Sequence, residues 1–138
     1  MYPEALVAPM RADLSTAGFQ ELKSPEQVDQ LLKNEKGTVL LVVNSVCGCA
    51  AGAARPGAKL AVSRSKVKPD VLATVFAGVD TAAVQKAREY FLPYPPSSPS
   101  MAIFKNGELV HFVERHHIEG RSAEMIAEHL QMVFEEIA

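Results

Sequence analysis

Residues 38–49 read Thr38-Val39-Leu40-Leu41-Val42-Val43-Asn44-Ser45-Val46-Cys47-Gly48-Cys49, and this stretch decides the fold. Its unbroken apolar run over residues 38–44 is typical of a central parallel strand that is buried on both faces. The Ala-rich residues 50–62 that follow predict a helix, interrupted near its middle by Pro56 and Gly57. A strand that leads into a helix places a thiol where backbone N–H groups and the helix dipole favour the reactive thiolate. The stretch therefore outlines a redox site.

The only two cysteines of the chain are Cys47 and Cys49. They lie too close together to join distant parts of a fold, so we expect them to serve chemistry. Cys47 falls at the exposed corner between strand and helix and is predicted to be the nucleophile, whereas Cys49 lies within the first turn and is partly covered. Gly48 keeps side-chain bulk from between the thiols, and Ser45, or in second place Asn44, is predicted to hydrogen-bond a thiolate.

The spacing of the cysteines also predicts the kind of exchange they perform. A disulfide between positions two apart closes a small, strained ring, and strain makes a disulfide easier to reduce. We therefore expect exchange, isomerisation or removal of a small-thiol cap in preference to reduction of stable disulfides.

Length and composition restrict the class of protein. The chain has 138 residues, of which 48% are hydrophobic, and this predicts a single domain spanning residues 1–138. A formal net charge of -2 gives no basic field for nucleic acid. The sequence shows neither a secretory leader pattern nor an apolar run of about 20 residues, so we expect a cytoplasmic protein that does not bind membranes.

Apolar periodicity and capping residues predict the remaining elements. Helices are expected over residues 5–14, from Pro25 towards residue 37 behind a Ser24 cap, after an Asp80-Thr81 cap, and over residues 123–137 behind a Ser122 cap. Strands are expected over residues 71–77, 100–104 and 109–113, and the last two form a hairpin through Asn106-Gly107. This order predicts an α/β sandwich: a mixed central sheet with helices on both faces. Ligands of such sheets gather at the carboxyl ends of the parallel strands, where the cysteines lie.

Motifs at separated places carry a family resemblance. The cysteines that open a helix with an internal proline, Val79-Asp80 after the next strand, and Ser98-Pro99 before a strand ending in Phe-Lys-Asn-Gly-Glu together resemble thioredoxin. A narrower set is similar to the bacilliredoxins, thioredoxin-like proteins with a Cys-Gly-Cys site that are also described as thiol-disulfide isomerases. This set comprises residues 43–52, Arg55-Pro56, residues 97–102, His111-Phe112, Arg115-His116 and residues 118–120.

The resemblance implies a thioredoxin-like three-layer sandwich and a thiol-disulfide oxidoreductase that acts in cell redox homeostasis. In such a fold the Ser98–Pro99 bond is cis and lies against the active site, where the missing N–H leaves the neighbouring backbone free to pair with an extended substrate. The implied partners are S-thiolated client proteins, a low-molecular-weight thiol that in this family is bacillithiol, and a separate disulfide reductase. No cofactor and no metal are implied. Thioredoxin has a buried acid six residues before its first cysteine, and that position is Leu41 here.

Two other classes of function fit the same residues. A Cys-x-Cys pair joined by His111, His116 and His117 would form a metal-binding module, although zinc sites usually use Cys-x-x-Cys spacing. A thioredoxin-like adaptor with two inert thiols is the other alternative. Arg55 is interpreted as a structural cation of the helix that also has the charge to attract an acidic small thiol.

Overall fold

The computed structural model describes residues 2–138. Its helices and strands follow in the order α1 (Glu4–Ser15), β1 (Gln20–Glu21), α2 (Pro25–Asn34), β2 (Thr38–Asn44), the π-helical turn η1 (Ala50–Ala54), α3 (Arg55–Arg64), β3 (Val71–Phe76), α4 (Thr81–Glu89), β4 (Ser100–Lys105), β5 (Glu108–Val113), α5 (Arg115–Ile118) and α6 (Ala123–Ile137).

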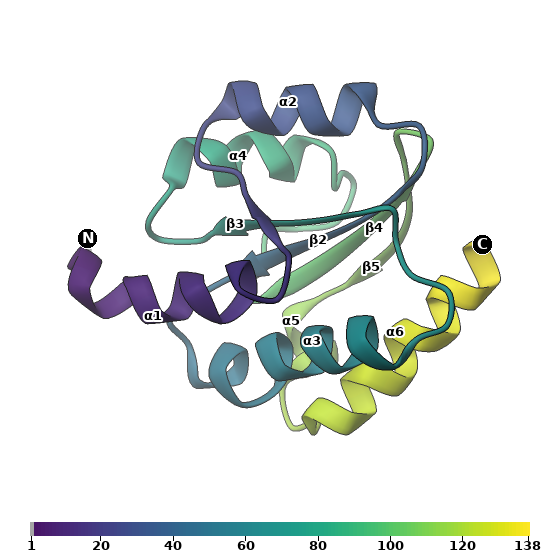
Figure 1. The fold of residues 1–138 in the computed structure, drawn as a ribbon. Coiled ribbons are helices and arrows are strands. Elements are labelled where there is room, and N and C mark those ends of the chain that lie inside the picture. Colours follow the sequence, from purple (N-terminus) through teal and green to yellow (C-terminus); the bar gives the residue numbers. More distant parts are fainter. Residues whose placement is uncertain (1) are drawn as a thin grey trace.

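The strands form one mixed sheet in the order β1-β3-β2-β4-β5. The pairs β1·β3 and β2·β3 are parallel, whereas β2·β4 and β4·β5 are antiparallel. Helices α2 and α4 cover one face of this sheet, and α1, α3 and α6 cover the other (Figure 1). The three-layer sandwich expected from the sequence is confirmed, and β2 lies at its centre.

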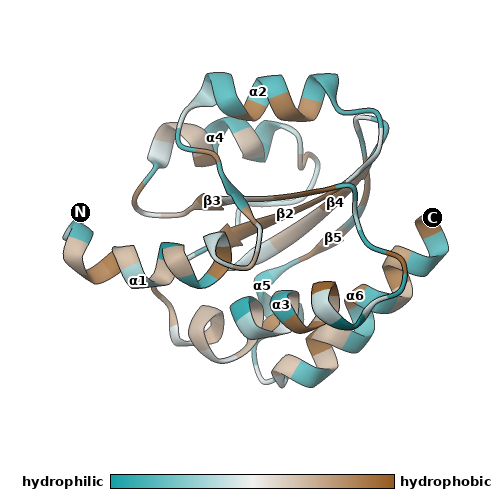
Figure 2. Ribbon diagram, in the orientation of Figure 1, coloured by the Kyte–Doolittle hydropathy of each residue, from teal (hydrophilic) through white to brown (hydrophobic). Residues whose placement is uncertain are grey.

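The two faces of β2 supply two separate cores. Leu40 and Val42 point towards α3 and α6, whereas Leu41 and Val43 point towards α2 and α4, because successive strand side chains alternate between faces. Hydrophobic residues accordingly concentrate in the central strands, while the helices carry hydrophilic residues on their outer sides (Figure 2).

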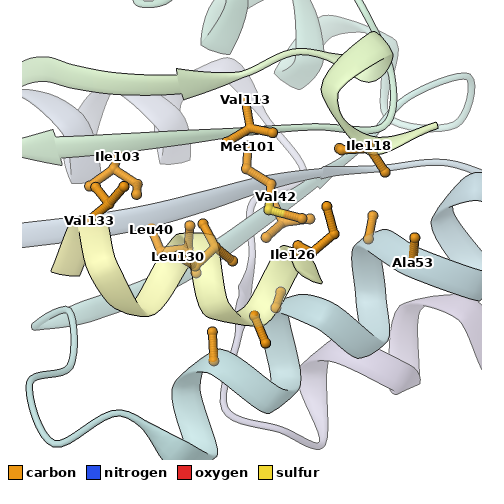
Figure 3. Packing of buried hydrophobic residues seen from close by; sticks show 14 of the residues in the cluster. Leu40, Val42, Ala53, Met101, Ile103, Val113, Ile118, Ile126, Leu130 and Val133 are labelled. Atoms are coloured by element: carbon orange, nitrogen blue, oxygen red, sulfur yellow. The ribbon is translucent and has the colours of Figure 1, made fainter. Parts of the chain in front are cut away.

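The core beneath α6 is the larger of the two, and Figure 3 shows part of it. Ile126, Leu130 and Val133 of α6 point towards apolar side chains of the sheet (Figure 3). This packing holds α3 and α6 against the face of the sheet that carries Leu40 and Val42 of β2. It thereby anchors α3, which follows the segment that carries the cysteines.

Three details differ from the sequence expectations. The short strand β1 and the four-residue helix α5 were not predicted, because neither is long enough to show a period. The irregularity in the helix after the cysteines is a π-helical turn that lies ahead of Pro56, not a kink at that residue. The Asp80 side chain does not cap α4; its carboxylate accepts two hydrogen bonds from Arg11 of α1, at 2.8 and 3.2 Å.

Other local predictions hold. Ser24 and Ser122 cap α2 and α6 by accepting backbone N–H groups three residues on. Asn106 and Gly107 connect β4 to β5 with φ angles of 52° and 82°, the left-handed values of a two-residue hairpin turn. Within residues 2–138, no helix combines the length and apolar character needed to cross a bilayer.

Candidate active site

Cys47 occupies the corner between β2 and the following helix. The chain becomes helical at Gly48. The Cys47 carbonyl accepts the N–H groups of Ala50 and Ala51 at 3.0 and 3.2 Å, and its Sγ accepts the N–H of Cys49 at 3.4 Å. Cys47 thus holds the first turn as an N-cap residue does, with sulfur in place of the usual oxygen. Its partly exposed side chain combines access from solvent with a helix N-terminus.

Arg115, which was not among the predicted site residues, supplies the second polar contact to this sulfur. Its Nη2 donates to Cys47 Sγ at 3.2 Å, and its Nη1 donates to the Ser98 carbonyl at 3.0 Å. Its backbone N–H donates to Ser97 Oγ at 3.3 Å. A capping box between Glu114 and His117 holds α5, which carries Arg115. The contact spans 68 positions of sequence, so no local pattern indicates it.

The surroundings of the two thiols shift their pKa values in opposite directions. The hydrogen bond from the Cys49 N–H, hydrogen bonding with the Cys49 thiol, the charge of Arg115 and the Ala50 N–H together lower the pKa of Cys47, against the effect of partial burial. The pKa of Cys49 is raised by its hydrogen bond to Cys47, by burial and by the negative charge of Cys47. Cys47 therefore ionises first, as a nucleophile must.

The loop before β4 lies against this site. The Ser98–Pro99 peptide bond is cis, as the resemblance implied, and Leu92–Pro93 is a second cis bond that was not expected. Pro99 is buried and Ser98 is half-buried. Because the Arg115 guanidinium contacts both the Ser98 carbonyl and Cys47 Sγ, it joins this loop to the nucleophile.

Ser45 and Asn44 do not play the predicted role. Ser45 Oγ accepts the Cys47 backbone N–H at 3.2 Å and so shapes the turn. Asn44 is buried; its Oδ1 accepts the Ser45 N–H at 2.9 Å, and its Nδ2 donates to the Met10 carbonyl at 3.1 Å. Among the described residues, the hydrogen bonds to Cys47 Sγ come from Cys49 and Arg115.

Arg55 has the structural role that was predicted. Its side chain is only 6% exposed. Nε donates to Asp13 at 3.0 Å, and Nη1 donates to Asn44 Oδ1 at 2.9 Å and to the Ser45 carbonyl at 3.0 Å. Arg55 therefore forms its ion pair and its hydrogen bonds inside the fold.

Gly48 is exposed and is not constrained in this structure. A Cβ added there would meet no atom within 4 Å, and its φ is not in the left-handed region. The free-thiol form therefore does not require glycine at this position. The expected benefit of Gly48 belongs to the oxidised pair and stays a prediction.

The histidines do not assemble with the cysteines. His111 pairs with His129 through their Nε2 atoms, 2.8 Å apart. His116 and His117 lie close to Glu114, and this is the one group of three or more metal-capable side chains in residues 2–138. Since neither cysteine belongs to it, the geometry does not support the mixed Cys/His metal module.

Comparisons with known proteins agree with this geometry. The model of the disulphide isomerase family matches residues 2–138. A bacilliredoxin from Cytophaga hutchinsonii is 65% identical over 99% of this chain and 100% of its own, and one from Geobacillus kaustophilus is 54% identical over 97% and 92%.

Solved structures establish the fold. Mitochondrial thioredoxin 3 from Saccharomyces cerevisiae superimposes with a TM-score of 0.58 at 13% identity, covering 90% of this chain and 98% of its own. Oxidised thioredoxin from Plasmodium falciparum gives 0.58 at 17% identity, covering 87% and 99%. At such identities the likeness concerns the thioredoxin fold alone.

Proposed function

This chain belongs to the bacilliredoxin family of thioredoxin-like oxidoreductases, and from that premise we propose that it removes low-molecular-weight thiols from mixed disulfides on client proteins. Bacillithiol is the small thiol that the family implies. The observation that carries the proposal is the partly exposed Cys47 sulfur, which accepts hydrogen bonds from a backbone N–H and from a guanidinium. No cofactor takes part; the small thiol is a co-substrate.

In the first step the Cys47 thiolate attacks the small-thiol sulfur of the mixed disulfide. The bond between the client and the small thiol breaks, and the client leaves as a thiolate that takes a proton from water. Cys47 now carries the small thiol as a neutral mixed disulfide.

The second step releases the small thiol. The Cys49 thiolate attacks Cys47 Sγ, the small thiol leaves, and a Cys47–Cys49 disulfide remains; alternatively, a second small thiol removes the first as a symmetric disulfide. A separate disulfide reductase supplies the two electrons that restore the free thiols.

The position that holds a buried acid in thioredoxin offers no base for the Cys49 proton here. Leu41, at the position of thioredoxin's acid, is fully buried and apolar. The raised pKa of Cys49 comes first from its hydrogen bond to Cys47 and, after burial, from the Cys47 charge. The charge effect of Cys47 requires its thiolate, so it ends when Cys47 enters the mixed disulfide. Burial and the charge of Glu119 still oppose the Cys49 anion, and the charge of Arg115 favours it. The first step thus removes one effect that opposes the second.

The test uses a client protein capped with bacillithiol and the variants Cys47→Ser and Cys49→Ser. We expect Cys47→Ser to abolish release of the client thiol. Cys49→Ser should still release the client and should accumulate a bacillithiol adduct on Cys47, detected by its mass. Full de-thiolation activity in Cys47→Ser would contradict the assignment.

Isomerisation of client disulfides is a second activity of the same thiols, and the description of the family as disulphide isomerases supports it. It begins with the same attack by Cys47, here on a protein disulfide. Recovery of activity by a scrambled disulfide-bonded protein, measured with the same two variants, tests it separately from de-thiolation.

A further inference from the structure

Arg115 is placed to contact more than the resting thiolate. Its guanidinium lies among three acceptors: Cys47 Sγ, the Ser98 carbonyl, and the Glu119 carboxylate, which accepts from Nε. The Arg115 side chain is 42% exposed, so a molecule that arrives from solvent can reach it. We propose that Arg115 is an anion subsite that selects small thiols bearing a carboxylate. The inference rests on the proposed function and adds a specificity determinant to it.

The charge balance around Arg115 changes during the reaction. Before attack, the Cys47 thiolate faces the cation. Once Cys47 forms a mixed disulfide, its sulfur is neutral, and Nη2 loses its anionic partner. A carboxylate on the attached small thiol can take that place, because guanidinium groups form strong charge-assisted hydrogen bonds with carboxylates.

The same subsite directs which sulfur is attacked. A mixed disulfide offers Cys47 either the client sulfur or the small-thiol sulfur, and the products differ. Attack on the small-thiol sulfur places that group beside Arg115. If the group is acidic, this attack is favoured over the one that would leave the client attached to Cys47.

Other cations around the turn do not duplicate this role. Arg55 is almost fully buried, and its donors are used by Asp13, Asn44 and the Ser45 carbonyl. Glu119 is the carboxylate bonded to Arg115, and it offsets part of the charge that a substrate would meet.

Arg115 also contacts the backbone segment that a docking peptide would use. A peptide that docks along backbone pairs with N–H and C=O groups in the receiving segment. Here Nη1 of Arg115 donates to the Ser98 carbonyl, next to the cis Pro99. A carbonyl oxygen can accept two hydrogen bonds, so a peptide would share this one with the guanidinium.

The experiment measures how fast Cys47 forms a mixed disulfide with three symmetric disulfides: anionic 3,3′-dithiodipropionate, neutral 2-hydroxyethyl disulfide and cationic cystamine. A Cys49→Ser background stops each reaction at the adduct, with one small thiolate released per Cys47. The readout is the ratio of the anionic rate to the neutral rate. All probes use the same thiolate, so a change in Cys47 ionisation cancels in this ratio.

We expect Arg115→Gln to lower this ratio roughly fivefold at low salt, the scale of an exposed ion pair. Arg115→Lys should retain part of the preference, and Glu119→Gln should raise it. The preference should fade at 1 M salt, where the screening length is about 3 Å. Arg121→Gln, which removes an exposed arginine outside the site, should behave as the unaltered chain does.

An unchanged ratio in Arg115→Gln, in a variant with the circular dichroism spectrum of the parent, overturns the subsite. A cystamine rate below the neutral rate in the parent chain supports the subsite if this difference is lost in Arg115→Gln. A chain whose Cys47 reacts with none of the three probes overturns the proposed function itself, so the two failures are distinguishable.

Discussion

At the scale of single residues, the site works because two similar thiols have different surroundings. Cys47 accepts a backbone N–H and faces a guanidinium, whereas Cys49 donates towards a neighbouring anion. The first arrangement favours the thiolate and the second opposes it. The division between nucleophile and resolving thiol therefore follows from a few contacts in the first helical turn.

The pH dependence of alkylation tests this division. Because the pKa of Cys47 is lowered and that of Cys49 is raised, iodoacetamide should label Cys47 first at pH 7, and the Cys49 rate should grow only in more alkaline solution. Arg115→Gln should slow Cys47 labelling at pH 7 by a factor of about two to five. The difference should vanish near pH 10, where Cys47 is ionised in both the parent chain and the variant.

Peptide mapping by mass spectrometry identifies the labelled cysteine at each pH. Arg121→Gln is the control for loss of a surface charge. Faster labelling of Cys49 than of Cys47 at pH 7 would reverse the assignment of roles.

The two cysteines were predicted from the local sequence and the cis Ser98–Pro99 bond from the family resemblance, whereas Arg115 was missed. The cysteines are visible because strand, thiol and helix are contiguous in the chain. Arg115 reaches them from a helix after β5, a contact that exists only once the chain has folded. For the same reason Ser45 and Asn44 looked suitable as thiolate partners, although their polar groups are used by the turn and by Arg55.

At the scale of elements, the contact of α3 with α6 supports the cysteine segment. Gly57 of α3 is buried against α6. A Cβ at Gly57 would lie 2.6 Å from both Cβ and Cγ2 of Ile126 and 3.2 Å from the Ala123 carbonyl oxygen. Close approach of the two helices therefore requires glycine at this position.

Gly57→Ala should destabilise the chain even though alanine favours helix formation. Overpacking costs about 1–3 kcal/mol, and the helix propensity of alanine returns up to about 1 kcal/mol, so we expect a net loss of about 1–2 kcal/mol in the free energy of unfolding. Gly52→Ala is the matched control, because a Cβ there meets nothing within 4 Å. Urea titration of both variants gives the comparison. Equal stability of the two would show that the helices can separate without cost.

The elements that could be predicted are those with a long apolar or periodic stretch of sequence or with a strong capping residue. The strand over residues 38–44 and the helix over residues 123–137 have the bounds that were expected. Asp80 shows the limit of local reasoning, because its carboxylate binds Arg11 of α1 in place of capping α4. A distant cation outcompeted the local backbone for the same oxygen atoms.

At the scale of the whole molecule, Arg55 joins three parts of the fold beneath the active site. It donates to Asp13 of α1, to Asn44 at the end of β2 and to the Ser45 carbonyl in the turn that leads to Cys47. Burial alone would raise the pKa of Asp13, but hydrogen bonds from Lys59 and Arg55 outweigh it and lower that pKa. The geometry of the nucleophile thus depends on the position of α1.

Arg55→Met should therefore weaken both stability and reactivity. It removes a buried cation and leaves Asn44 Oδ1 and the Ser45 carbonyl without that donor, so we expect a loss of about 2–4 kcal/mol in the free energy of unfolding and slower labelling of Cys47. Lys59→Met is the control; Lys59 bonds the same Asp13 but is 39% exposed, and its loss should cost less than about 1 kcal/mol.

The pH dependence separates this ion pair from simple packing. A carboxyl with a lowered pKa stabilises the folded chain above its ordinary titration range, and that contribution disappears as the pH falls through the lowered pKa. The stability gap between the parent chain and Arg55→Met should accordingly narrow in acid, as measured by urea titration at a series of pH values. A stability difference that stays constant down to the lowest pH at which the chain folds would contradict this. It would mean that Arg55 acts through packing and through its hydrogen bonds to neutral acceptors, and that its ion pair with Asp13 does not stabilise the position of α1.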